Sequence, residues 1–137
     1  MTKATAILGE KMRISSSVQG YSHGYVIDSA KVIGGLEEYP SPLGMLCSSL
    51  AGCMLILAGM AANKKKIDIV GMEIDVSLEM NPQHQIQKFV ITVRCPKPLS
   101  EGQAKILKEA MFSCPVHRGL DPDIEKEHHF QWQITEE

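Results

Sequence analysis

The sequence lacks an excess of positive charge. Its 137 residues contain 14 Lys and Arg against 16 Asp and Glu, which gives a net charge of -2 and a pI of about 6.2. Proteins that bind nucleic acid usually carry clustered basic residues, and the only basic cluster here is the short run Lys64–Lys66. We therefore expect no nucleic-acid partner.

Two further patterns are missing. The four cysteines, Cys47, Cys53, Cys95 and Cys114, form no C-x-x-C pair, so their spacing is not that of a zinc site. The N-terminal stretch MTKATAILGEK has no apolar core of the kind found in a secretory signal peptide. We expect a cytoplasmic chain with reduced thiols, and a cysteine pair in that compartment is more often catalytic or redox-active than a structural disulfide.

Charge is absent from Pro42 to Asn63, and this stretch organises the chain. Ser41 suits an N-cap, Pro42 suits the first turn of a helix, and the lysines follow where a helix C-terminus favours positive charge. The pattern predicts a helix that is apolar on every side, which must be buried all round or lie in a membrane. A chain of 137 residues is marginal for such burial, so we expect a partner subunit.

A membrane span is the alternative for this helix. Its length is sufficient, and the lysine run would serve as a cytoplasmic flank. The stretch is nevertheless rich in Gly, Ser, Ala and Cys, and strand patterns lie on both sides of it, as in one compact domain. We therefore expect a buried core helix and no membrane partner.

The flanking segments predict strands and a second helix. Residues 4–18 alternate as a strand with a break near Gly9, and Ser100 with Gln103 forms a capping box before a second helix that ends near Phe112. The other expected elements are strands at 21–29, 67–80, 87–95 and 123–134, and a turn or short helix at 115–119 closed by Gly119. We expect the last three residues to be frayed. The sequence predicts one α+β domain, residues 1–137, with antiparallel sheet around the long helix.

Cys53 and Cys114 are the residues with potential chemistry. Cys53 lies mid-helix, and it is either a small core residue or a nucleophile. Only a thiolate is nucleophilic, so the second interpretation requires a cation from elsewhere in the chain. The candidates are Arg13, Arg94, His117 and Arg118. Cys114 follows a helix and precedes Pro115, near His117, and it is either an inert turn residue or a second reactive thiol.

The remaining cysteines and histidines suggest no site. We expect a core role for Cys47 and none for Cys95. Cys114, His117, His128 and His129 follow the pattern C-x2-H-x10-HH, but His128 and His129 are adjacent in a strand and face opposite sides. We therefore expect no metal site.

Two motifs resemble the OsmC/Ohr family. SPLGMLCSSLAGC at 41–53 is similar to that family's helix start and peroxidatic cysteine, and FSCPVH at 112–117 is similar to its second cysteine motif. The resemblance covers essentially the whole chain. It implies an OsmC-like fold in which antiparallel sheets wrap a long buried helix and two chains intertwine as a homodimer.

The resemblance also implies a thiol peroxidase. Cys53 would attack an organic hydroperoxide, Cys114 would close an intramolecular disulfide, and an external dithiol would reduce it, with no cofactor or metal. Arg13 would be the arginine that family peroxidases place beside the reactive thiol. The glutamate that those enzymes carry near the helix start is absent from Pro42–Met45, and the nearest upstream acids are Glu37 and Glu38.

This departure keeps an alternative open. Without the glutamate we expect weaker turnover, and some OsmC-like proteins bind small ligands instead of reducing peroxides. A non-catalytic small-molecule-binding protein is therefore the second hypothesis, and a membrane-anchored domain is the third.

Overall fold

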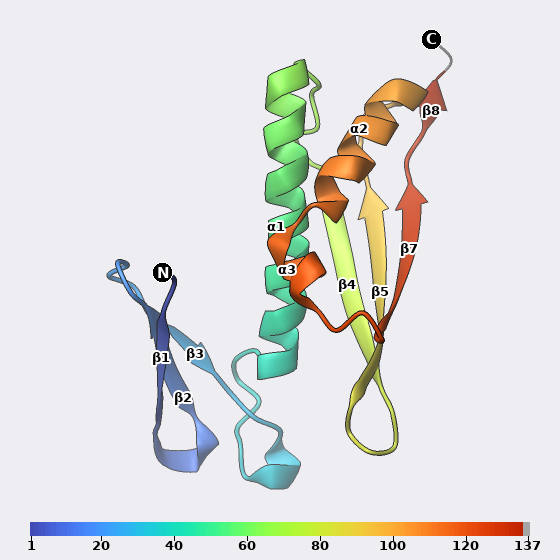
Figure 1. Cartoon of the computed structure of the whole chain (residues 1–137). Helices are drawn as coiled ribbons and strands as arrows, with labels where there is room; N and C mark the ends of the chain where they lie inside the picture. Colours follow the sequence, from blue (N-terminus) through green and yellow to red (C-terminus); the bar gives the residue numbers. More distant parts are fainter. Residues whose placement is uncertain (136–137) are drawn as a thin grey trace. The chain divides into compact units, whose positions relative to one another are not determined.

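The structure, a computed structural model, describes residues 1–135 (Figure 1). By their internal contacts the residues form two compact units, Met1–Leu46 and the chain from Cys47 onward, and each is described by itself. The first unit contains β1 (Ala4–Leu8), the 3-10 turn η1 (Glu10–Met12), β2 (Ile14–Val18), β3 (Tyr25–Ile27), the 3-10 turn η2 (Lys31–Ile33) and the start of α1 (Pro42–Lys65). The second contains the rest of α1, then β4 (Glu73–Met80), β5 (Ile86–Arg94), β6 (Leu99–Ser100), α2 (Glu101–Phe112), α3 (Pro115–Gly119), β7 (Glu125–Gln131) and β8 (Ile134–Thr135).

The N-terminal unit is a three-stranded sheet in the order β1-β2-β3, antiparallel throughout. The prediction of one strand over residues 4–18 was wrong, because the chain reverses between Gly9 and Arg13 and pairs Leu8 with Ile14. Lys11 and Met12 make this reversal in the left-handed region, with φ of 56° and 57°. The expected strand at 21–29 is confined to the three residues of β3.

Helix α1 begins and ends close to the predicted positions. The Ser41 Oγ accepts a hydrogen bond from the Gly44 N–H at 3.1 Å, which confirms the N-cap. By length and composition α1 is a candidate to cross a membrane, a test that the core helix of a soluble protein also passes. Within residues 1–135, the fully buried positions of α1 lie on one face, at Leu50, Met54, Ala58 and Ala62.

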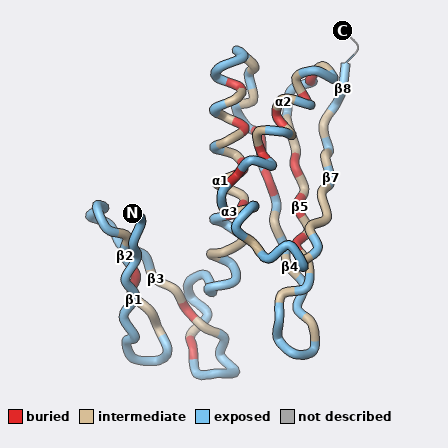
Figure 2. The backbone as a smooth tube through the Cα atoms, in the orientation of Figure 1, coloured by how far each residue is buried: buried red, intermediate tan, exposed pale blue. Residues whose placement is uncertain are grey.

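The second unit is built on the sheet β4-β5-β7 (Figure 1). Phe89, Ile91 and Val93 of β5 have no exposed surface, and in Figure 2 the buried positions lie along this strand and on parts of α1 and α2. The opposite face is polar and charged. There Lys88 pairs with Glu127 at 2.8 Å, and Arg94 pairs with Asp75. The alternation read from the sequence thus separates a core face from a solvent face.

One detail of the sheet differs from expectation. The β4–β5 pair is antiparallel as predicted, but β7 runs parallel to β5, and β8 runs parallel to β6. Helices α2 and α3 lie between β5 and β7 in the chain, and a helical crossover returns the next strand in the same direction. The α+β class is confirmed, whereas a purely antiparallel arrangement is not.

Helix α2 is fixed by the predicted capping box. The Gln103 N–H donates to the Ser100 Oγ at 3.2 Å, and the Ser100 N–H donates to the Gln103 Oε1 at 3.0 Å. Ala104, Leu107 and Met111 form its buried face. The predicted short helical turn after Cys114 is present as α3. Thr135, expected to be frayed, pairs in β8, while Glu136 and Glu137 lie outside the described residues.

Candidate functional site

Cys53 lies at the border between the covered and the open side of α1. Its side chain is half-buried, and its neighbour Met54 is fully buried. Ile56 and Met60 follow Cys53 at spacings of three and seven residues, which places them on its side of the helix. Each of these two is 63 % exposed. Cys53 is therefore reachable from an apolar surface, unlike a residue of the core.

Cys114 is fully buried between α2 and α3. Its N–H donates to the Met111 carbonyl at 3.2 Å, which ties it to the last turn of α2. Its Sγ caps α3 by accepting a hydrogen bond from the His117 N–H at 3.3 Å. Pro115 occupies the first position of that helix, where the missing N–H has no cost. The thiol thus sits at a rigid corner of the chain.

The structure brings Cys53 and Cys114 together. Burial raises the pKa of the Cys114 thiol, and its hydrogen bond to Cys53 raises that pKa further, while the His117 N–H lowers it. A thiol with a raised pKa keeps its proton and can donate it to a neighbouring sulfur. All four cysteines are free in this structure. The arrangement can therefore offer Cys53 as the attacking sulfur and Cys114 as its partner.

His117 and His128 form a second feature beside the thiols. Their Nε2 atoms are 3.1 Å apart, and the two side chains are half-buried. Phe112 lies edge-on to His128, with 4.8 Å between the ring centroids. Burial lowers the pKa of both histidines, so the neutral forms are favoured and neither serves as a resident cation for a thiolate.

Arg13 belongs to the N-terminal unit and is held there by two acids. Its guanidinium donates to Asp28 at 3.0 Å and to Glu38 at 2.5 Å, and it lies over the Tyr39 ring at 4.9 Å. These hydrogen bonds, led by Glu38, raise the pKa of Arg13. Gly35 lets the loop that carries Glu38 fold back, because a Cβ there would lie 2.1 Å from the Ser29 carbonyl oxygen.

Asp28 is the buried acid beside Arg13, and the sequence patterns did not single it out. It has 1 % of its surface exposed and its pKa is lowered to about 2, first by the Glu38 N–H and then by Arg13 and other donors. An acid directly after an apolar strand was the available signal, at the end of YVID. The pairing of His117 with His128 was also missed, because residues of α3 and β7 meet only through the fold.

The other candidates lie elsewhere. Arg94 pairs with Asp75 on the solvent face of the sheet, and Arg118 is exposed. Burial raises the pKa of Cys47, but the side chain is only half-buried and is not among the fully buried core residues, so the expected core role is not confirmed. Among residues 1–135, no cluster of three or more His, Cys, Asp and Glu side chains is arranged to hold a metal ion.

Comparisons with known proteins place this geometry in context. The sequence model of the family described as OsmC-like protein matches residues 35–128. No curated protein sequence gives a match. A Psychrobacter arcticus protein, named for osmotic stress induction and a detoxification response, has 26% identity and a TM-score of 0.87, with 96% of each chain covered.

Two other solved structures share the fold at lower identity. One is an OsmC like protein from Mycoplasma pneumoniae, with 21% identity, 97% of each chain covered and a TM-score of 0.78. The other is an organic hydroperoxide resistance protein from Legionella pneumophila, with 16% identity, 96% of each chain covered and a TM-score of 0.72. The family match spans more than half of the sequence and contains both Cys53 and Cys114. This chain belongs to the OsmC-like protein family.

Proposed function

We propose that this protein reduces organic hydroperoxides with Cys53 and Cys114. The observation that carries the proposal is the contact between a half-buried thiol on an open helix face and a fully buried thiol with a raised pKa. Membership of the OsmC-like family and the likeness to an organic hydroperoxide resistance protein support it.

The proposed cycle uses two thiols in sequence. The Cys53 thiolate attacks the distal oxygen of the peroxide, the O–O bond breaks, and the alkoxide takes a proton and leaves as an alcohol. Cys53 becomes a sulfenic acid. The Cys114 sulfur then attacks the Cys53 sulfur, and the sulfenic hydroxyl leaves with the Cys114 proton as water. An external dithiol reduces the resulting disulfide and is itself oxidised. This need for a dithiol agrees with a cytoplasmic location.

The roles of the two thiols follow from their surroundings. Cys53 is half-buried, so a substrate can reach its sulfur directly. Cys114 has no exposed surface, so in this scheme it reacts with the oxidised Cys53 and does not meet the peroxide itself. The two amides at the start of α3, those of Val116 and His117, hydrogen-bond to its sulfur and lower its pKa against the effect of burial. They favour the developing thiolate during disulfide closure.

We propose, from the family resemblance alone, that Arg13 is the arginine that serves the Cys53 thiol. The helix start lacks the family's glutamate, but Glu38 in the preceding loop holds the guanidinium at 2.5 Å and Asp28 holds it at 3.0 Å. An arginine fixed by two acids is oriented in advance, which is the role that the missing glutamate would have. Glu38→Gln should slow the loss of Cys53 thiol, and Arg94→Gln on the solvent face of the sheet should not.

We propose that the protein is a homodimer in which the open face of α1 is covered by a second copy. Ile56 and Met60 are exposed on a helix that has no charge before Lys64. Burying such a face removes apolar surface from water. Sedimentation of the untagged protein in buffer without detergent should give a dimer. Recovery only from membranes would instead support the membrane-anchored alternative.

The test of the proposed activity is rapid mixing of reduced protein with one equivalent of an organic hydroperoxide, followed by mass mapping of disulfides. Wild type should lose two thiols into a Cys53–Cys114 bridge. Cys114→Ser should stop at a Cys53 sulfenic acid, and Cys53→Ser should not react beyond the rate of a free cysteine. Cys95→Ser is the matched control and should behave as wild type. Equal slow oxidation in all four proteins would refute the proposal.

A small-molecule-binding role is the second candidate, and one observation favours it. A cavity of about 520 Å³ lies beside α2 and β8, where apolar side chains are combined with two lysines. It is lined by Glu101, Ala104, Lys105, Lys108, Glu109, Phe112, Trp132 and Ile134. A defined apolar ligand that co-purifies with unreactive cysteines would favour this function over the peroxidase.

A further inference from the structure

The two imidazole rings of His117 and His128 point directly at each other. Their Nε2 atoms are 3.1 Å apart, and their ring centroids are 5.3 Å apart. The centroid separation exceeds the nitrogen separation by about two ring radii. Both nitrogens therefore lie almost on the line that joins the ring centres. The planes are inclined by 35°, which leaves this alignment intact. The contact is therefore end to end, unlike a stack of two rings.

This alignment defines what can lie between the rings. A metal ion bound by two imidazoles needs Nε2 bonds of about 2.0 to 2.1 Å, which two nitrogens facing each other at 3.1 Å do not allow. One hydrogen atom fits the gap at an ordinary hydrogen-bond distance. In the neutral pair, one ring carries its proton on Nε2 and the other on Nδ1. The histidines form an N–H···N bridge.

The bridge connects two elements of the site. His117 is on α3, and the Cys114 sulfur caps the N-terminus of this helix. The backbone N–H of His117 donates the capping hydrogen bond to that sulfur at 3.3 Å. His128 is on β7 in register with Ile91 of β5, which has no exposed surface. One residue, His117, thus contacts the Cys114 sulfur through its backbone and the sheet through its side chain.

We propose that the His117–His128 bridge is a positioning device that holds Cys114 in place to close the disulfide with Cys53. The inference rests on the proposed function of the two thiols. Neither histidine touches the substrate in this scheme, and both act through the position of α3. Phe112, with centroids 5.8 Å from His117 and 4.8 Å from His128, packs against both rings and keeps them aligned.

The bridge has a defined response to pH. One added proton gives an N–H⁺···N hydrogen bond, which is stronger than the neutral one. A second proton places two N–H donors opposite each other and breaks the bridge. The charged or titratable groups around the pair are Lys126 and His129 on β7, Lys108 on α2 next to Phe130, and Cys114 itself. The cations among them oppose the second proton, so the bridge should persist as the pH falls below 6.5.

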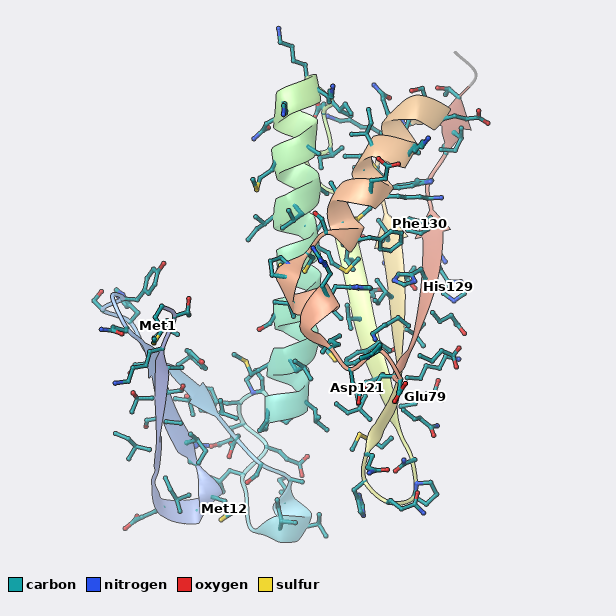
Figure 3. All side chains as sticks on the ribbon, viewed as in Figure 1. Met1, Met12, Glu79, Asp121, His129 and Phe130 are labelled. Atoms are coloured by element: carbon teal, nitrogen blue, oxygen red, sulfur yellow. The ribbon has the colours of Figure 1, made fainter. Side chains whose placement is uncertain are left out.

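The strand supplies a matched control. His129 is adjacent to His128 but lies on the solvent face, where its Nε2 is 2.6 Å from the Glu127 Oε2. Figure 3 labels His129 and Phe130 on β7, and Phe130 packs against Phe112 at 6.3 Å on the core face with His128. His128→Phe removes the bridge and keeps an aromatic ring against Phe112. His128→Gln keeps a polar group toward His117, and His129→Gln changes only the solvent face.

The experiment separates the two chemical steps. Sulfenic acid on Cys53 is trapped with dimedone to give the rate of peroxide attack, and quenched samples give the rate of disulfide closure. Diamide provides a second route to the same disulfide, because it takes two electrons and two protons from the thiols without peroxide. At pH 7 we expect His128→Phe to close about fivefold more slowly than wild type, as for loss of one hydrogen bond. Peroxide attack should be unchanged.

The control variants and the pH profile test whether the bridge positions Cys114 for disulfide closure. His128→Gln should recover most of the closure rate, and His129→Gln should match wild type. The ratio of wild-type to His128→Phe closure should shrink toward one at acid pH, which a merely structural role would not produce. Equal closure rates in His128→Phe and wild type, with either oxidant, would overturn the proposal. Absence of peroxide attack in wild type with normal diamide closure would instead refute the proposed function alone.

Discussion

Two methionines on α1 test the proposal that a second copy covers one face of this helix. Met54 has no exposed surface, whereas Met60 is 63 % exposed in the single chain. Both lie in the same helix, and Met→Ala changes helix propensity little. Met54→Ala should lower the free energy of unfolding by about 3 kcal/mol, because it leaves a cavity in the core. This loss should appear at every protein concentration.

Met60→Ala should act on the dimer instead. In an isolated chain, an exposed substitution of this kind changes stability by about 0.5 kcal/mol or less. If a second copy covers Met60, each lost side chain removes about 1.5 kcal/mol of apolar burial. The two copies together then raise the dimer Kd about a hundredfold.

The assay combines denaturant unfolding at several protein concentrations with sedimentation equilibrium. Wild type and Met60→Ala should differ most in the dilute samples, and Met54→Ala should be equally destabilised in all of them. An unchanged dimer Kd in Met60→Ala would contradict the proposed interface, and a cost below about 1 kcal/mol for Met54→Ala would contradict its core position.

Three further predictions concern single interactions. Asp28 has a folded pKa of about 2 against an ordinary 3.8, so its contribution is present above pH 4 and is lost as pH falls from about 4 to 2. Asp28→Asn should reduce the loss of free energy of unfolding between about pH 4 and pH 2. Because the pKa of His117 and of His128 is lowered, their contribution to the free energy of unfolding is present above pH 6.5 and is lost as the pH falls below 6.5. His128→Phe should make the free energy of unfolding, measured by circular dichroism, fall less steeply with decreasing pH in this range. Ser100→Ala should cost about 1 kcal/mol in denaturant unfolding through loss of the α2 cap, and Ser100→Thr should restore most of it.

Local patterns predicted both helix caps and the core face of β5. The N-cap at Ser41, the capping box at Ser100 and the period-two alternation of β5 depend on neighbouring residues alone, and the structure contains all three. The α+β class and the family resemblance are confirmed. The single-domain prediction stays a prediction, because the structure describes two compact units separately.

Errors arose where distant segments decide the structure. The direction of β7 depends on the crossover through α2 and α3, which alternation within one strand does not encode. The break at Gly9 was visible, but whether it interrupts a strand or reverses it depends on the pairing of Leu8 with Ile14. The same reason hid the Arg13–Asp28 ion pair and the His117–His128 bridge, whose partners are 15 and 11 residues apart.

The central claim is that Cys53 and Cys114 reduce an organic hydroperoxide together. The most direct measurement is a single-turnover balance in which reduced protein meets a limiting amount of organic hydroperoxide and both the alcohol and the disulfide are quantified. We expect one alcohol and one Cys53–Cys114 disulfide for each peroxide consumed, at a rate far above that of a free cysteine. Peroxide consumption without that disulfide, or at the rate of a free cysteine, would contradict it.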